Sequence, residues 1–170
     1  MPQETTISHD ALIDALSGYV TTDANGTVVY CNSKGEPHRL DGPAIIFADG
    51  EEHWYQNGKR HRIDGPAIIH PTGEQHWYQN GKRHRTDGPA TMHPNGEEHW
   101  YQNGVPHRIG GAAIIYSSGT KAWYRNGKLH RTDGAAVVFP NGEMCWFLNG
   151  TEVSEEEFNR RITTGEYRDA

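Results

Sequence analysis

Short apolar and aromatic runs alternate with polar turns along most of the chain, and the alternation repeats every 23 residues from residue 31 onward. The run 67–70 is rich in β-branched residues and lies between Gly65-Pro66 and the turn residues 71–73. The run 74–79 is aromatic and stops at Asn80-Gly81. Such runs between glycine-containing turns are typical of short β-strands. The pattern predicts two strands and two turns in each unit, and an antiparallel meander of about ten strands in all.

Several positions of the unit keep the same residue type in every copy. The tryptophans occupy one such column, at Trp54, Trp77, Trp100, Trp123 and Trp146. A His-Arg pair occupies another, at residues 38–39, 61–62, 84–85, 107–108 and 130–131, and an aspartate follows each arginine by two residues except at Gly110. We expect tight reversals at Asn57-Gly58, Asp49-Gly50 and Asn95-Gly96 alike, because these residues reach positive φ at low cost.

A fixed period of about 20 to 50 residues indicates an array in which each unit buries its apolar face against its neighbours. We therefore predict a mainly all-β fold, an elongated single antiparallel sheet of stacked 23-residue β-hairpin repeats. The predicted organisation is an N-terminal helix and lead-in over residues 1–25, five full repeats and a partial unit over 26–153, and a C-terminal helix and tail over 154–170. The tryptophans, with Ile45, Ile68, Ile114 and Val137, are expected to form the interior.

Short helices are expected to cover both ends of the array. Ser154 and Glu157 have the spacing of a capping box, and Val153 is placed to pack on Phe158. Apolar residues recur at helical spacing over residues 7–16 before Gly18. A sheet that ended without such covers would expose its edges to association.

Charge and composition narrow the classes of function. The chain has 22 acidic and 16 basic residues, a net charge of −6, whereas extended nucleic-acid binding needs an uncompensated basic stripe. Nucleic acid is therefore not an expected partner, and docking on a membrane surface is only weakly supported by the basic turns 59–62 and 82–85. No apolar run reaches the length of about 18 residues that a membrane span needs, and residues 1–4 lack the features of a signal peptide. Cys31 and Cys145 stand at opposite ends of the array, which argues against a disulfide. We expect a cytoplasmic protein.

The His-Arg-x-Asp element contains an acid and a base, and this raises the question of catalysis. An active site needs one asymmetric pocket with a nucleophile or metal beside the base, but every copy here is the same turn and has no recurring Ser, Cys or Glu. We predict that the chain is not an enzyme and has no catalytic residues. In the structural interpretation, the aspartate caps the Gly-Pro turn, while the histidine and arginine tie that turn to a strand of a neighbouring unit.

Eleven histidines also raise the question of a metal. Equivalent histidines of neighbouring units are two strands, or about 9.6 Å, apart, whereas zinc ligands lie about 2.1 Å from the ion. Within one unit, the answer depends on the turn at 71–73. A two-residue turn sets His70 and His76 on opposite faces, and a three-residue turn sets them on one face. No metal or other cofactor is predicted.

The string Trp-Tyr-x-Asn-Gly-Lys-x-His-Arg-x-Asp-Gly-Pro-Ala resembles the MORN (membrane occupation and recognition nexus) repeat over residues 26–153. It is most similar to a MORN variant of phage, giant-virus and bacterial proteins, some of them described as antitoxin-like. The segment His-Arg-x-Asp-Gly-Pro departs from the usual His-Gly-x-Gly. The resemblance implies an elongated hairpin sheet, protein scaffolding, self-association in some members, an affinity for phospholipid headgroups, and a setting of conflict between phage and bacterium.

Our leading hypothesis is a non-enzymatic scaffold that binds a protein partner through its aromatic and charged sheet face. The candidate contact residues are Trp77, Tyr78, His84, Arg85, Trp100 and Tyr101. The alternative is a protein that sequesters a small phosphorylated ligand or nucleotide, and the third hypothesis is a module that docks on phospholipid. Association of identical chains through their ends or sheet edges is also considered.

Overall fold

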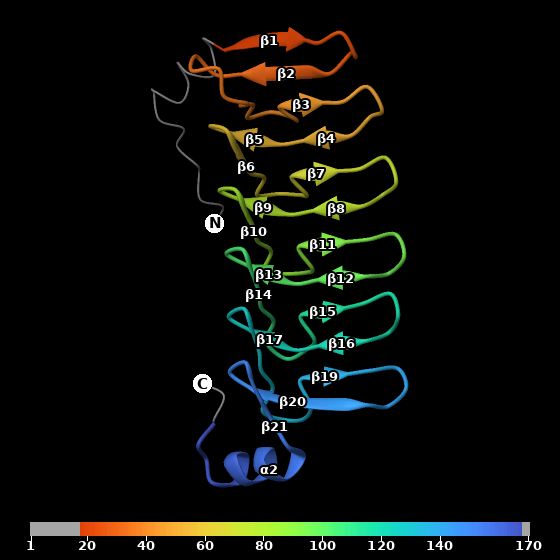
Figure 1. Ribbon diagram of the computed structural model, residues 1–170. Coiled ribbons are helices and arrows are strands. Elements are labelled where there is room, and N and C mark those ends of the chain that lie inside the picture. Colours follow the sequence, from red (N-terminus) through yellow and green to blue (C-terminus); the bar gives the residue numbers. More distant parts are fainter. Residues whose placement is uncertain (1–17, 168–170) are drawn as a thin grey trace, which may run out of the picture. The chain divides into compact units, whose positions relative to one another are not determined.

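The computed structural model describes residues 18–167, and the elements in this range are short β-strands followed by one helix, α2 (Glu155–Thr163) (Figure 1). All pairings between these strands are antiparallel. The predicted mainly β fold of antiparallel hairpin repeats is confirmed. The helix expected over residues 7–16 lies outside the described residues.

The chain divides into two compact units, Met1–Gly81 and Lys82–Ala170. In the first unit, the principal strands pair in chain order. They are β1 (Tyr19–Thr22), β2 (Val28–Cys31), β3 (Ile45–Ile46), β4 (Glu52–His53), β7 (Ile68–Ile69) and β8 (Gln75–His76). The second unit repeats this arrangement. Its strands are β11 (Thr91–Met92), β12 (Glu98–His99), β15 (Ile114–Ile115), β16 (Lys121–Ala122), β19 (Val137–Val138), β20 (Met144–Leu148) and β21 (Thr151–Val153).

A second kind of hairpin lies beside the principal strands. It is formed by β5 (Tyr55–Gln56) with β6 (Lys59–Arg60), by β13 (Tyr101–Gln102) with β14 (Val105–Pro106), and by β17 (Tyr124–Arg125) with β18 (Lys128–Leu129). Strand β9 (Tyr78–Gln79) ends the first unit and β10 (Lys82–Arg83) begins the second.

The prediction of two strands per repeat is therefore wrong, because the second strand divides at the tryptophan. The N–H of Trp54 donates to Ala67 O (2.8 Å) in the principal sheet, while Trp54 O accepts from the N–H of His61 (3.1 Å) in the small hairpin. The backbone changes partner at this one residue, and the repeat 54–76 consequently contains four very short strands, as do the repeats 77–99 and 100–122, whereas β20 continues through Trp146.

The two kinds of hairpin have different turns. Asn57 and Gly58 both have positive φ, 48° and 71°, as a two-residue type I′ turn requires, and this prediction is confirmed. Asp49-Gly50 is instead the end of a three-residue loop, in which the N–H of Phe47 donates to Glu51 O (2.9 Å) and only Gly50 has positive φ (88°). Asn95-Gly96 forms the same loop. The chain reverses tightly at all three sites, as expected, but in two different kinds of turn.

The most deeply buried column consists of alanines and not of tryptophans. Its members Ala44, Ala67, Ala90, Ala113 and Ala136 are completely inaccessible to solvent, while the tryptophans are half-buried. Ala67 donates its N–H to His76 O and accepts from Trp54 N–H, both at 2.8 Å. Its backbone is therefore in the middle of the ladder, where a small side chain lets neighbouring strands approach.

The C-terminal helix begins where the sequence predicts. Ser154 Oγ accepts the N–H of Glu157 (3.1 Å), and Phe158 is buried. The carboxylate of Glu157 does not complete a capping box, because it binds Arg160 and Arg161 instead. Helix α2 lies against β20, near the end of the second unit.

Candidate interaction and metal-ligand sites

Four arginines of the His-Arg column lie over an aromatic ring. The guanidinium carbon of Arg62 is 4.2 Å from the ring centroid of Trp54, and that of Arg108 is 3.7 Å from the centroid of Trp100. Arg131 lies over Trp123 and Arg39 over Tyr30, both at 4.1 Å. At these distances the cation is attracted by the electron-rich face of the ring.

Hydrogen bonds fix the same guanidinium from its edge. Arg62 Nε donates to Asp64 Oδ1 (3.0 Å) and Arg62 Nη1 donates to Pro66 O (3.3 Å). The hydrogen bond from Arg62 lowers the pKa of the Asp64 carboxyl. The aspartate thus binds the arginine of its own turn, and the turn is held rigidly beneath the stacked pair.

The histidine column ties neighbouring repeats together, but it contacts a turn of the next repeat and not the expected strand. The Nδ1 atoms of His61 and His84 each accept a backbone N–H, from Asn80 and Asn103 respectively, at 3.2 Å. Each asparagine belongs to the Asn-Gly turn of the following repeat. Since the donated N–H is at the turn itself, the histidine ties one small hairpin to the next.

The predicted partner residues therefore all have contacts within the fold. Arg85 Nε donates to Asp87 (2.8 Å) and its N–H donates to Tyr101 O (3.0 Å). Arg60 lies 5.5 Å from the ring centroid of Tyr78, and Arg83 lies 5.5 Å from that of Tyr101. Trp77, Tyr78, His84, Arg85, Trp100 and Tyr101 are all half-buried. The first two lie in the first unit and the others in the second, and their role in partner binding stays a prediction.

A different apolar column is much more exposed. Ile63 is 75% exposed and Ile109 73% exposed, and Leu40 is 43% exposed. These residues occupy the variable position of His-Arg-x-Asp. The sequence analysis missed them because it considered the residues that recur in every repeat. An apolar residue within a polar turn could have indicated an exposed contact residue.

The second unit has a shallow depression of about 330 Å³ beside Ile109. Arg108, Arg125 and Arg131 line it, together with Trp123. Arg131 pairs with Asp133 (2.6 Å), but Gly110 replaces the corresponding partner of Arg108. Arg108 Nη1 donates to Ala112 O (3.1 Å). The depression therefore contains three guanidinium groups and the carboxylate of Asp133.

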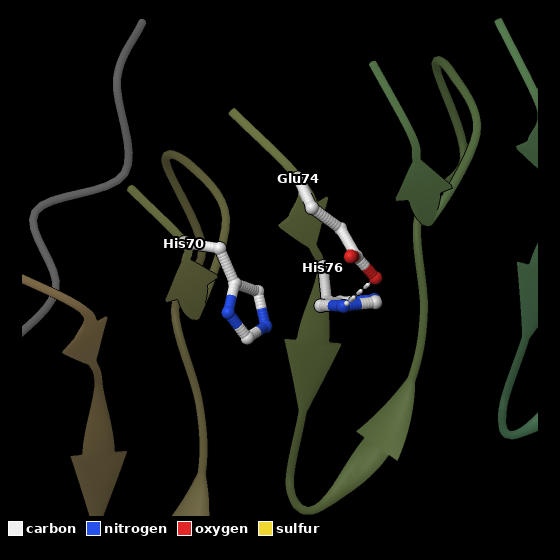
Figure 2. A group of neighbouring side chains, drawn as sticks. All are labelled: His70, Glu74 and His76. Atoms are coloured by element: carbon white, nitrogen blue, oxygen red, sulfur yellow. Dashed lines mark ion pairs between the residues drawn. The ribbon is translucent and has the colours of Figure 1, made fainter. Parts of the chain in front are cut away.

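The principal hairpins bring histidine and glutamate together (Figure 2). The N–H of His70 donates to Glu74 O (2.9 Å), and Ile68 pairs with His76. This is a three-residue turn, so His70, Glu74 and His76 share one face. Their ligand atoms all lie within 4.8 Å of one another, and Glu74 Oε1 is 2.8 Å from His76 Nε2.

The next repeat has the same constellation. His93, Glu97 and His99 surround the turn 94–96 in the second unit, and their ligand atoms also lie within 4.8 Å of one another. Glu97 Oε1 is 2.7 Å from His99 Nε2. The single glycine at the third turn position, Gly73 or Gly96, is the sequence signal that would have predicted this geometry.

Glu51 links His70 of the first cluster with one further histidine, His53, in the first unit. Its Oε1 atom lies 2.5 Å from His53 Nε2, and its Oε2 atom lies 3.2 Å from His70 Nδ1. Burial lowers the pKa of His53, although its hydrogen bond with Glu51 opposes that effect. His53 is thus held mainly as a neutral, buried side chain.

Comparison with protein-family models gives no match for this chain, and comparison with curated protein sequences gives none. Among residues 18–167, no helix has both the length and the apolar character needed to cross a membrane.

Proposed function

We propose that the chain is a non-enzymatic repeat module, of the MORN type that its motif resembles, which binds a protein partner through the variable residues of its His-Arg-x-Asp turns. The observation that carries this proposal is the exposure of Ile63 and Ile109, at 75% and 73%. Both project from turns whose arginine is stacked on tryptophan.

A rigid turn favours association because little conformational entropy is lost when a partner binds. Arg62 is fixed by Trp54, Asp64 and Pro66, so that Ile63 is presented on an ordered backbone. Complete burial of such a side chain contributes about 1.5–3 kcal/mol. A few apolar anchors of this kind dominate the affinity of many interfaces.

The repeated chemistry of the turns supports a binding role over a catalytic one. In the turn 61–64, for example, the arginine, aspartate and histidine are all engaged in stacking or hydrogen bonds within the fold. A polar group whose bonding capacity is used in this way is poorly placed to transfer protons to a substrate.

The test is affinity capture from the native host with the intact chain and three variants. I63S/I109S is expected to lose the captured protein, while M144S is expected to retain it, because Met144 is also exposed (51%) but lies on β20. Y78A/Y101A tests the originally predicted aromatic residues. Retention by I63S/I109S together with loss by Y78A/Y101A would move the interface to the tyrosines, and capture of nothing by the intact chain would contradict the proposal.

A second candidate function is the sequestration of a small phosphorylated ligand, and Gly110 is the observation that favours it. Gly110 stands where the other repeats have an aspartate, so Arg108 lacks that carboxylate. Arg108 lines the depression with Arg125 and Arg131. Guanidinium groups recognise phosphate oxygens through paired N–H donors.

Calorimetric titration with inorganic phosphate and with ATP tests this candidate. G110D would restore a carboxylate beside Arg108 and is expected to abolish binding. G142D is the matched control, because Gly142 also has positive φ (88°, against 76° at Gly110) and open space around it, but lies on a different loop. Equal binding by all three proteins, or by none, would exclude the site.

A further inference from the structure

We infer that the two histidine–glutamate clusters, His70/Glu74/His76 and His93/Glu97/His99, are binding sites for Zn²⁺ or a similar late first-row divalent ion, one ion per cluster. Within residues 18–167, these are the groups of three whose ligand atoms lie within 4.8 Å of one another. The inference is independent of the proposed partner binding, because the clusters lie on the principal hairpins and not on the His-Arg-x-Asp turns.

The donor set fits this class of ion. Two imidazole nitrogens and one carboxylate oxygen suit zinc, whereas magnesium and calcium prefer oxygen ligands alone. Ligand atoms of one tetrahedral zinc ion are about 3.3 Å apart, since each bond is about 2.0–2.1 Å long. Glu74 Oε1 and His76 Nε2 are already 2.8 Å apart, so that small side-chain rotations bring the set to bonding distance.

The backbone sets this arrangement before any ion binds. The three-residue turn pairs His70 with Glu74 through a 2.9 Å hydrogen bond, and the β-ladder pairs Ile68 with His76. All three side chains project from the same face of one hairpin, as Figure 2 shows. The rings of His70 and His76 meet at 5.7 Å between centroids, and those of His93 and His99 meet at 5.8 Å.

Glu51 supplies an outer support for the first cluster. Its carboxylate lies 3.2 Å from Nδ1 of His70, which leaves Nε2 as the nitrogen for a metal. A carboxylate on the far nitrogen is the usual partner of a metal-bound histidine, because it fixes the tautomer and the ring orientation. Here it comes from the equivalent turn of the preceding repeat.

Partial exposure lets an ion enter and leaves a coordination position open. The side chains of His70 and Glu74 are 31% and 28% exposed, and that of His76 is 9% exposed. Three protein ligands with solvent access leave the fourth position for water or for a group from another molecule.

The other repeats lack the complete set, although their backbone is the same. The corresponding residues are Phe47, Glu51 and His53 in one repeat, Tyr116, Thr120 and Ala122 in another, and Phe139, Glu143 and Cys145 in a third. The hairpin therefore does not need two histidines and a glutamate to form. The formation of the hairpin therefore does not explain why two repeats contain both histidines and the glutamate.

The test is equilibrium dialysis of the full chain, first stripped with chelator, against ZnCl₂ in a non-coordinating buffer. We expect about two ions per chain, one ion for H70F, one for H93F, and none for H70F/H93F. Phenylalanine is chosen because Phe47 occupies this position in the first repeat, 5.0 Å from His53 between ring centroids. H61Q changes a histidine outside the clusters and is expected to keep both ions.

Two readouts on the metal itself complete the test. Co²⁺ should give the intense visible absorption of a four-coordinate site, and that signal should halve in each single variant. In the intact protein, Zn²⁺ should shift the ring ¹⁵N resonances of the cluster histidines before those of His61, a result that does not depend on the folding of any variant. Absence of stoichiometric zinc, or zinc content unchanged in H70F/H93F, would overturn the inference. If H70F loses an ion and H93F loses none, the inference holds for the first cluster alone, and the reverse result confines it to the second.

Discussion

The guanidinium group of Arg62 lies across Gly65, so that a β-carbon on residue 65 would come within 2.8 Å of Arg62 Cζ. The same approach recurs at Gly88, where the distance is 2.6 Å, and at Gly134, where it is 3.1 Å. The φ angles of these glycines are not positive, so the requirement for glycine is steric. The glycine that follows the aspartate of the motif is therefore explained by the arginine that stacks on tryptophan.

We expect G65A to lower the free energy of unfolding by about 1–2 kcal/mol, because Arg62 must give up part of its stacking on Trp54 and its hydrogen bonds. Urea unfolding measures this cost. In the R62A background, the same substitution should be nearly neutral, since no guanidinium remains to be displaced. An undiminished cost in that background would show that Gly65 is required for another reason.

The Asn-Gly turns should be sensitive to the loss of asparagine. Asn57 has a φ of 48°, and its Oδ1 atom lies 2.8 Å from Nδ1 of the buried His38. We expect N57A to cost about 1–2 kcal/mol, since alanine is strained at positive φ. N57G removes the contact alone and should cost less. Equal costs in urea unfolding would contradict a conformational contribution.

The repeat period was enough to predict the class of fold, because a column of identical residues reports the spacing of structural units directly. The tight turn at Asn57-Gly58 was also predictable, since few pairs of residues adopt positive φ at two successive positions. The division of the strand at Trp54 was not predictable, because it depends on which neighbour accepts each backbone group. Periodicity alone contains no information about that choice.

The candidate sites were predictable only in part. The sequence showed that His70 and His76 are close along the chain, but their common face depends on the length of the turn 71–73. The stacking of Arg62 on Trp54 was missed, because it depends on the path of the chain after the small hairpin that joins the two residues, and the pattern of residue types does not fix that path. The exposure of Ile63 follows from that packing and was missed with it.

Acidification should destabilise the first unit through His53. Burial places the folded-state pKa of His53 below the ordinary value of 6.5, so the unfolded state binds more protons as the pH falls below 6.5. The contribution to stability is thus present above pH 6.5 and is lost as the pH falls through the folded-state pKa. Urea unfolding in the presence of chelator should show this loss between pH 7.5 and 5.

The matched variant for this effect is H53F, since Ile45 lies opposite residue 53 and Phe47 packs on its ring. H53F should have a flatter dependence of stability on pH over the same range. H61Q changes a hydrogen-bonded histidine of the other column, and it should retain most of the dependence of stability on pH. Glu51, His70 and Arg60 also act on His53, and a slope unchanged in H53F would show that His53 is not the source of the acid sensitivity.

Helix α2 should remain intact at a pH that protonates ordinary carboxyl groups. Hydrogen bonds from Arg160 and Arg161 lower the pKa of Glu157 from 4.5 to about 2, so this carboxylate stays charged at pH 3, near the helix N-terminus where a negative charge is favourable. NMR titration of the Glu157 side-chain carboxyl carbon should give a midpoint near that value, and R160A/R161A should move it back toward 4.5. S154A, which removes the cap on the Glu157 N–H, should leave the midpoint nearly unchanged while it speeds amide exchange in the first turn. A midpoint near 4.5 in the intact protein would mean that the two arginines do not hold Glu157 in solution, and α2 should then lose protection between pH 5 and 3.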